Sequence, residues 1–198
     1  MKPIDLAGFE AKFAGDDDPW STWTSHDEAV KRDAILHALG PGPLGRVLEL
    51  GAGNGSNSRP LAARALRLDA TEATDEGVRL VAATVEGQRG ARALKLVVPA
   101  KPPRSTYDAI VVAELLYYLT PGDMATLARQ VARALRPGGM LVLAHHRITF
   151  YDFVQHAEGI HARFLAETGM AWRARVVRRT GRWAVCALSP CRSSVAAR

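Results

Sequence analysis

Residues 47–55 read Val-Leu-Glu-Leu-Gly-Ala-Gly-Asn-Gly, and this stretch decides the fold. Its first four residues form an apolar run typical of a short buried strand, and a helical pattern follows over residues 58–65. Glycines in such a turn let the backbone approach a ligand at the carboxyl end of the strand, where a Cβ atom would block it. We therefore predict a nucleotide-like ligand at Gly51, Ala52, Gly53 and Gly55, although a simple tight turn has the same spacing.

The chain on either side of this turn alternates between strand and helix patterns. Further strands are expected over residues 66–71, 93–98, 107–113, 140–144, 172–180 and 182–188, and helices over 76–86, 123–135 and 153–168. Two more helices precede the turn, the second beginning after Ser25 with Glu28 at the capping-box spacing. Buried strands separated by helices predict a mostly parallel sheet with helices on both faces, and the last two strands predict an antiparallel hairpin. We expect a helical lid segment over 1–43, a catalytic domain over 44–190 and a tail over 191–198.

Composition narrows the class of protein. The 198 residues are 47% hydrophobic and 23% charged, which is ordinary for a soluble globular chain. The net charge of +6 comes from scattered arginines, so it favours a solvated surface over a nucleic-acid or membrane partner. Two cysteines provide neither a disulfide framework nor a metal site, and we expect no metal. Without a signal peptide or a long apolar run, the sequence predicts a cytoplasmic protein.

Two acidic residues indicate which ligand the turn binds. Glu49 precedes the first glycine by two residues, where a carboxylate repels a diphosphate but suits an ammonium group. The third glycine also comes one residue too early for a dinucleotide turn, and Ser56 stands at the expected glycine. Glu72 ends the second strand, where a carboxylate can accept hydrogen bonds from a ribose diol; Asp69 is its rival. These features favour S-adenosylmethionine over NAD.

Arg46 to Leu188 resembles the class I S-adenosylmethionine-dependent methyltransferases. The resemblance is carried by V-L-E-L-G-A-G-N-G, by Glu72, by Y-D-A-I-V-V-A-E-L-L-Y-Y-L after residue 106 and by L-R-P-G-G-M-L-V after residue 134. It implies a Rossmann-like α/β fold, with the glycine turn at the methionine moiety and Glu72 and Ala73 at the ribose. The segment from Ala113 to Tyr118 then lines the reaction centre. Since residues 98–101 have no carboxylate, we expect adenine to be held by backbone groups and apolar packing, with Val98 among the cofactor-binding residues.

The N-terminal segment is similar to that of the NodS-type methyltransferases. F-A-G-D-D-D-P-W begins at Phe13, Ser25, Glu28 and Lys31-Arg32 follow, and Q-H-A-E-G-I-H begins at Gln155. This resemblance implies N-methylation of a free amine on an amino sugar. The chain departs from the family at His26-Asp27, where aromatic residues are usual.

The candidate catalytic residues lie where the fourth and fifth strands end. Glu114 is the first choice, with Tyr118 (or Tyr117) to position the acceptor and His146 (or His145) to accept a proton. Neighbouring residues of a strand point to opposite faces, so one histidine of the pair is expected in the cleft. Trp20 is a candidate lid residue and Arg32 a candidate partner for the methionine carboxylate.

The predicted function is therefore methyl transfer to a small molecule, most simply to the amine of an amino sugar or a related metabolite. The alternatives are O-methylation of a hydroxylated metabolite, an RNA or protein methyltransferase, an NAD-binding oxidoreductase and a catalytically silent binding protein. The sequence leaves the acceptor and the oligomeric state open.

Overall fold

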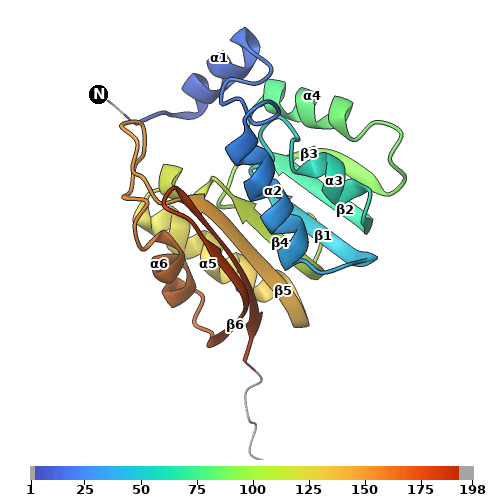
Figure 1. The fold of residues 1–198 in the computed structure, drawn as a ribbon, viewed down its shortest axis with the longest axis vertical. Coiled ribbons are helices and arrows are strands. Elements are labelled where there is room, and N and C mark those ends of the chain that lie inside the picture. The colour runs from blue at the N-terminus through green and yellow to red at the C-terminus, as the bar shows by residue number, and fades with distance from the viewer. Residues whose placement is uncertain (1–2, 192–198) are drawn as a thin grey trace, which may run out of the picture.

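A seven-stranded sheet runs through the computed structural model, which describes residues 3–191 (Figure 1). The strand order is β3-β2-β1-β4-β5-β7-β6. The first five strands are parallel, and β7 and β6 join them as an antiparallel hairpin. The predicted Rossmann-like fold is confirmed. The strands are β1 (Leu44–Leu50), β2 (Ala65–Glu72), β3 (Ala91–Lys95), β4 (Tyr107–Ala113), β5 (Leu135–His146), β6 (Trp172–Arg179) and β7 (Trp183–Pro190).

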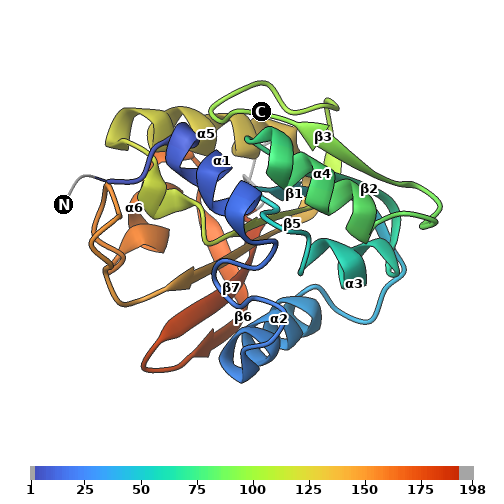
Figure 2. The same cartoon turned by 90° about the horizontal axis from the view of Figure 1, so that it is seen from above.

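Helices cover both faces of the sheet because its strands are apolar on both sides. Alternate residues of β1 show this: Val47 packs under α2, α3 and α4, whereas Leu48 packs under α5 and α6. Figure 2 shows α2 and α3 on one side of the sheet and α5 on the other. The helices are α1 (Leu6–Gly15), α2 (His26–Ala38), α3 (Ser58–Ala62), α4 (Asp75–Thr84), α5 (Pro121–Ala134) and α6 (Ile160–Glu167), with a 3₁₀ turn η1 (Leu116–Tyr118).

The strand order creates a natural ligand position between β1 and β4. From β1 the chain builds outward through β2 to β3, and then returns to the other side of β1 with β4. At such a switch point the loops that follow the two central strands diverge and leave a crevice at their carboxyl ends. The glycine turn after β1 and the segment after β4 both begin at this crevice.

Two elements begin five or more residues from their predicted starts, and β3 ends at Lys95 instead of at the predicted Val98. The helix expected over 153–168 begins only at Ile160, after Gly159, whose φ of 71° lies in the left-handed region. Residues before it are held in a loop instead, since the backbone N–H groups of Val154 and Gln155 both donate to the carbonyl of Tyr117. Strand β5 starts at Leu135 rather than Met140, because Leu135 pairs with Tyr107 across a bulge.

The N-terminal segment lies over the carboxyl edge of the sheet. Helix α1 packs on α4, where the Glu10 carboxylate accepts hydrogen bonds from the N–H groups of Asp75 and Glu76 at 2.8 and 3.0 Å. In Figure 2, α1 lies across the end of the sheet. Over the described residues, no helix has the length and apolar character needed to cross a lipid bilayer.

Candidate active site

The glycine turn brings three segments into close contact. Gly51, Gly53 and Gly55 all have φ between 60° and 85°, a conformation that side chains other than glycine rarely adopt. A Cβ atom on Gly55 would lie 2.8 Å from the Cβ of Thr84 in α4, and one on Gly51 would lie 3.2 Å from Leu115 after β4. The turn therefore requires glycine for its conformation and for the close approach of these neighbours.

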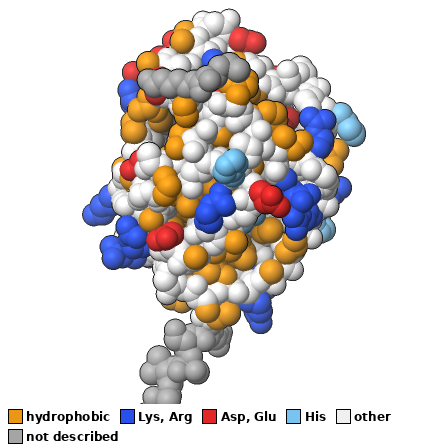
Figure 3. Space-filling model, turned by 90° about the vertical axis from the view of Figure 1, so that its left-hand side faces the viewer, with side chains coloured by type: hydrophobic (Ala, Val, Ile, Leu, Met, Phe, Trp, Pro, Cys, Tyr) orange, Lys and Arg blue, Asp and Glu red, His pale blue; other side chains and the backbone are white. Residues whose placement is uncertain are grey.

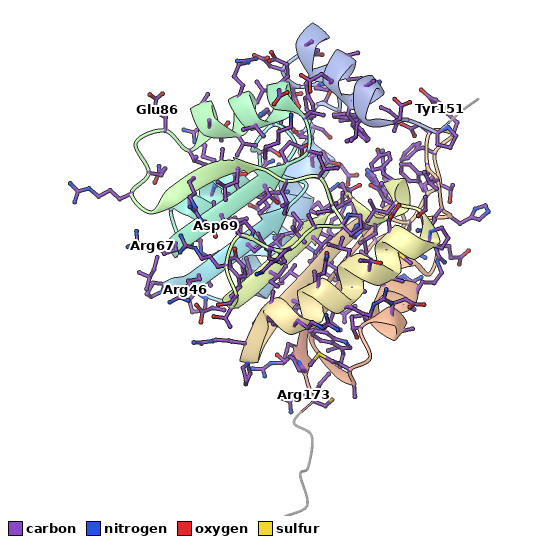
Figure 4. The ribbon with its side chains drawn as sticks, turned by 180° about the vertical axis from the view of Figure 1, so that it is seen from behind. Arg46, Arg67, Asp69, Glu86, Tyr151 and Arg173 are labelled. Carbon is purple, nitrogen blue, oxygen red and sulfur yellow. The ribbon has the colours of Figure 1, made fainter. Side chains whose placement is uncertain are left out.

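Glu72 lies at the turn, whereas its rival Asp69 does not. The Glu72 carboxylate accepts hydrogen bonds from the N–H groups of Gly53 (2.9 Å) and Ala73 (2.7 Å), and burial raises its pKa in spite of these donors. Asp69 instead accepts from Arg92 Nε (2.6 Å), Arg104 Nε (2.9 Å) and Tyr107 Oη (2.8 Å). Figure 4, which views the molecule from behind, labels Asp69 on the side of the sheet that faces the viewer, near β2 and β3. Asp69 thus belongs to a structural network, and Glu72 is the acid available at the crevice.

Glu72→Ala is expected to weaken cofactor binding by about 1–3 kcal/mol, because charge-assisted hydrogen bonds to the ribose are lost. Gly77→Ala provides a matched disturbance, since its Cβ would lie 2.5 Å from Glu72 Cγ and would displace the carboxylate without removing it. Calorimetric titration with S-adenosylhomocysteine measures both variants. Unchanged affinity in both would mean that Glu72 does not hold the ribose.

Glu49 is a buried acid, and one of its two side-chain oxygens has no hydrogen-bond partner among the described residues. It is 1% exposed, its Oε2 accepts a 2.6 Å hydrogen bond from Ser58 Oγ, and its Oε1 has no hydrogen-bond partner among residues 3–191. Burial raises its pKa to about 8, and the nearby Glu72 carboxylate adds to the effect. A buried polar atom without a partner costs free energy, which a ligand with a donor group recovers.

These groups fit S-adenosylmethionine and disfavour a dinucleotide. The unpartnered oxygen of Glu49 suits the ammonium of an amino-acid end, and Glu72 suits a ribose diol, whereas neither acid offers a diphosphate a favourable partner. Of the other predicted cofactor residues, Ala52 is buried in the turn and donates to the carbonyl of Thr71 at 2.8 Å. Ala113 is buried at the end of β4, and Val98 is partly buried against the core.

The N-terminal segment is tied to the turn through Asn54. Its Nδ2 donates to the carbonyl of Asp17 (3.0 Å) and to Asp18 Oδ1 (2.9 Å). Trp20 packs against Phe13 and Phe9 of α1, with ring centroids 5.3 and 5.8 Å away. The segment therefore closes over the turn, where a lid residue is expected.

Arg32 contacts two residues of the segment that precedes α2. Its Nη1 donates to the carbonyl of Thr22 at 2.9 Å, and its guanidinium lies 5.8 Å from the ring of Trp23. This arrangement holds the lid segment on α2, and the contact of Arg32 with the methionine carboxylate stays a prediction.

Glu114 is the centre of a second group of charged side chains at the crevice. Its Oε1 accepts a 2.7 Å hydrogen bond from Lys31 Nζ, its Oε2 accepts a very short one from Tyr117 Oη, and His146 Nε2 lies 4.0 Å away. Lys31 also donates to Glu28 Oε1 at 2.8 Å, and His146 Nε2 lies 3.5 Å from the same oxygen. We call Glu28, Lys31, Glu114, Tyr117 and His146 the acceptor cluster.

The mutual attraction of Glu114 and Lys31 favours the charged form of both side chains. Burial alone would raise the pKa of Glu114, but Lys31 and His146 more than offset it and hold that pKa below its usual value. Burial likewise opposes the charge of Lys31, yet Glu114 and Glu28 raise its pKa. Glu114 also has a φ of 52°, in the left-handed region; such backbone strain in a residue other than glycine is concentrated at functional sites.

The two neighbouring histidines of β5 have different surroundings: His146 lies near the carboxylates Glu28 and Glu114, whereas the ring of His145 lies edge-on to Tyr117. His145 is 1% exposed, and its Nε2 accepts hydrogen bonds from the backbone N–H groups of Leu115 (3.2 Å) and Leu116 (3.1 Å). Its Nδ1 lies 3.0 Å from His161 Nε2. Because Nε2 accepts, the network assigns the proton to Nδ1, which donates to His161. His145 thus fixes the strained segment that carries Glu114.

His145→Phe is expected to lower the free energy of unfolding by about 2–4 kcal/mol, because two buried N–H groups lose their acceptor. It should also speed amide exchange at Leu115 and Leu116. Thermal unfolding and amide exchange by NMR measure the two effects. His146→Phe, one residue along the same strand, is the matched control and should leave both amides protected. Protected amides in His145→Phe would contradict this role.

The structure also brings in residues that the sequence prediction did not select. Tyr117, not Tyr118, contacts Glu114; Tyr118 packs between Phe9 and Phe153, with ring centroids 4.9 and 5.2 Å away. A catalytic role for Tyr118 stays a prediction. Ser25 precedes α2 as expected, but its side chain makes no capping hydrogen bond, and Glu28 binds Lys31 instead of closing a capping box. The i, i+3 spacing of Glu28 and Lys31 was the one signal in the sequence for this pair.

Comparison with known proteins agrees with this geometry. Residues 48–141 match the family described as "Methyltransferase domain". The N-methyltransferase NodS from Bradyrhizobium japonicum WM9, solved with S-adenosyl-L-homocysteine, superposes with a TM-score of 0.81 at 21% identity, over 93% of this chain and 97% of that one. The DhpI–SAH complex gives 0.74 at 19% identity, over 95% and 96%. A protein from Pseudomonas syringae described as a methyltransferase gives 0.71 at 25% identity, over 84% and 100%. No curated protein sequence matches the chain.

The matched residues 48–141 run from β1 through the glycine turn, Glu72 and Glu114 to β5, so they contain the crevice and most of its acidic side chains. The structural similarities extend the shared fold over nearly the whole chain. Residues 48–141 thus match a methyltransferase domain, and the fold of nearly the whole chain resembles that of the N-methyltransferase NodS.

Proposed function

We propose that the protein transfers the methyl group to the nitrogen of a small-molecule amine, such as that of an amino sugar. The observation that carries this proposal is the position of Lys31 Nζ, which lies 2.8 Å from Glu28 and 2.7 Å from Glu114. The acceptor cluster therefore already binds one alkylammonium group. Carboxylates that hold one alkylammonium group can bind a second cationic group in the same way, whereas a neutral hydroxyl gains no comparable advantage.

The two groups of acids at the crevice have separate binding roles in this proposal. Glu49 and Glu72 hold the cofactor by its ammonium and ribose, and the lid segment excludes water. When bound, S-adenosylmethionine supplies a methyl carbon on a sulfonium, which is electrophilic without further activation. The chain must then mainly align the amine, and alignment of this kind contributes roughly 7–11 kcal/mol to lowering a barrier.

An ammonium group must lose a proton before its nitrogen can attack. Glu114 is a weak base, since its pKa is held below the usual value, and it serves better to bind and orient the amine. His146 lies 3.5 Å from Glu28 and 4.0 Å from Glu114, so its imidazole is placed to take up the proton. Tyr117 donates to Glu114 and fixes the direction of the carboxylate.

A matched pair of acceptors tests the proposal. The protein is incubated with isotopically labelled S-adenosylmethionine and either glucosamine or glucose, and the label in the product is located by mass spectrometry and NMR. We expect label on nitrogen with glucosamine and none with glucose. Label on a hydroxyl oxygen of both sugars would contradict N-methylation and favour the O-methyltransferase alternative.

A further inference from the structure

An exposed apolar segment follows β5 directly beside the acceptor cluster. Among residues 3–191, ten large hydrophobic side chains are exposed, and four of them fall within seven consecutive positions. We call these four the apolar rim: Ile148 (46% exposed), Phe150 (42%), Tyr151 (65%) and Val154 (39%). Clusters of exposed apolar side chains on a soluble chain commonly mark a binding surface.

The apolar rim is fixed to the site. The ring of Phe153 stacks on Tyr117 with centroids 3.6 Å apart and planes 9° from parallel. The N–H groups of Val154 and Gln155 donate to the carbonyl of Tyr117 at 2.9 and 3.0 Å. The ring of Phe150 lies edge-on to His146, with centroids 5.6 Å apart. One edge of the rim therefore touches the imidazole that faces Glu28 and Glu114.

The rim also extends outward from the acceptor cluster. Figure 4 shows Tyr151 projecting from the edge of the molecule on the side of α1. Figure 3 faces the side on which this loop lies and shows hydrophobic side chains with a few charged ones among them. A ligand that starts between the carboxylates and runs along the loop thus meets charge first and apolar surface next.

We infer that the acceptor is an amphipathic amine, with its ammonium at Glu28 and Glu114 and an apolar portion on the apolar rim. This inference rests on the proposed function and adds the class of substrate. The charge of the acceptor cluster selects the head group, and Phe150, which contacts His146, joins the two surfaces. A fully polar amine uses the carboxylates alone and leaves the rim in water.

The test is a series of n-alkylamines from ethylamine to octylamine. KM is measured in the methylation assay, and Kd is measured by calorimetry on protein loaded with S-adenosylhomocysteine. Both are expected to fall about twofold per added methylene over the first several carbons, which corresponds to partial burial of each methylene. A KM and Kd that are independent of chain length would overturn the inference while leaving N-methylation intact. No methylation or binding of any amine would overturn the proposed function as well.

Variants separate the apolar rim from the rest of the surface. Phe150→Ser and Tyr151→Ser should each flatten the dependence of KM and Kd on chain length; Tyr151 is the more exposed, so its replacement is tolerated by the fold. Val177→Ser, at a side chain 59% exposed on β6, is the control and should keep the full dependence. If the rim instead covers a second copy of the chain or a bilayer, its variants will change sedimentation or vesicle binding without changing the dependence, which overturns the inference.

Discussion

Glu49→Gln is expected to weaken binding of S-adenosylhomocysteine by about 10- to 100-fold and, at the same time, to stabilise the free protein. The loss follows because a neutral amide replaces the carboxylate that faces the ligand's ammonium, and hydrogen bonds to charged groups contribute about 1.5–3 kcal/mol. The gain follows because Glu49 is buried and its Oε1 has no partner within residues 3–191. Glu49 Oε1 thus strengthens ligand binding and lowers the stability of the free protein.

The gain in stability has a defined pH dependence. Burial raises the pKa of Glu49 to about 8, so in the folded protein it keeps a proton that the unfolded chain loses near pH 4.5. Between these two values the unfolded state is favoured progressively as pH rises, and the wild type loses stability that the glutamine variant keeps. The difference in unfolding free energy should be near zero at pH 4.5 and should reach about 2–4 kcal/mol by pH 8.

Thermal unfolding from pH 4.5 to 8.5 and calorimetric titration measure the two effects. Glu86→Gln makes the same chemical change at an exposed loop residue, labelled in Figure 4, and should change neither quantity. A Glu49→Gln variant that is less stable than the wild type at pH 8, or that binds with unchanged affinity, would contradict the role assigned to this carboxylate.

Glu114→Gln is expected to lower kcat/KM for the amine acceptor by about 100-fold, with most of the loss in KM. The amide retains the size of the side chain but removes the charge that binds the ammonium. Cofactor affinity should stay within about threefold of the wild type, because Glu49 and Glu72 form the other group of acids. Steady-state kinetics with glucosamine and titration with S-adenosylhomocysteine separate the two effects.

A control for Glu114→Gln is available on α6. Glu167 is half-exposed and lies 3.8 Å from Arg129 at the surface, so Glu167→Gln should leave kinetics and binding unchanged. If Glu114→Gln loses cofactor affinity in parallel with activity, the acid would belong to the cofactor site and not to the acceptor cluster.

The sequence predicted those parts of the protein that are determined locally. Strand β4 has the predicted bounds, since Tyr107–Ala113 is apolar at every position except Asp108, which is typical of a buried parallel strand. The glycine turn and the acid at Glu72 followed from steric and charge requirements that involve few residues. The choice of Glu72 over Asp69 rested on strand alternation, and the structure places Asp69 among arginines instead.

Long-range contacts were beyond the same reasoning. Lys31 and Glu114 are 83 positions apart, and no local pattern indicates that α2 brings the ammonium to the end of β4. The sequence left the choice between Tyr117 and Tyr118 open, because adjacent residues in a short 3₁₀ turn give no periodicity to separate them. The late start of α6 has a similar cause: the loop before it is held by Tyr117, and helical propensity does not report that contact.

The most direct test of the central claim is the number of protons released when S-adenosylhomocysteine binds at pH 7, obtained by calorimetry in buffers of different ionisation enthalpy. The buried acid of the free protein carries a proton at this pH, and it must give that proton up to face an ammonium group. One-to-one binding with release of close to one proton is the expected result, and release should vanish in Glu49→Gln. Absence of binding, or binding with no proton exchange in the wild type, would contradict the account.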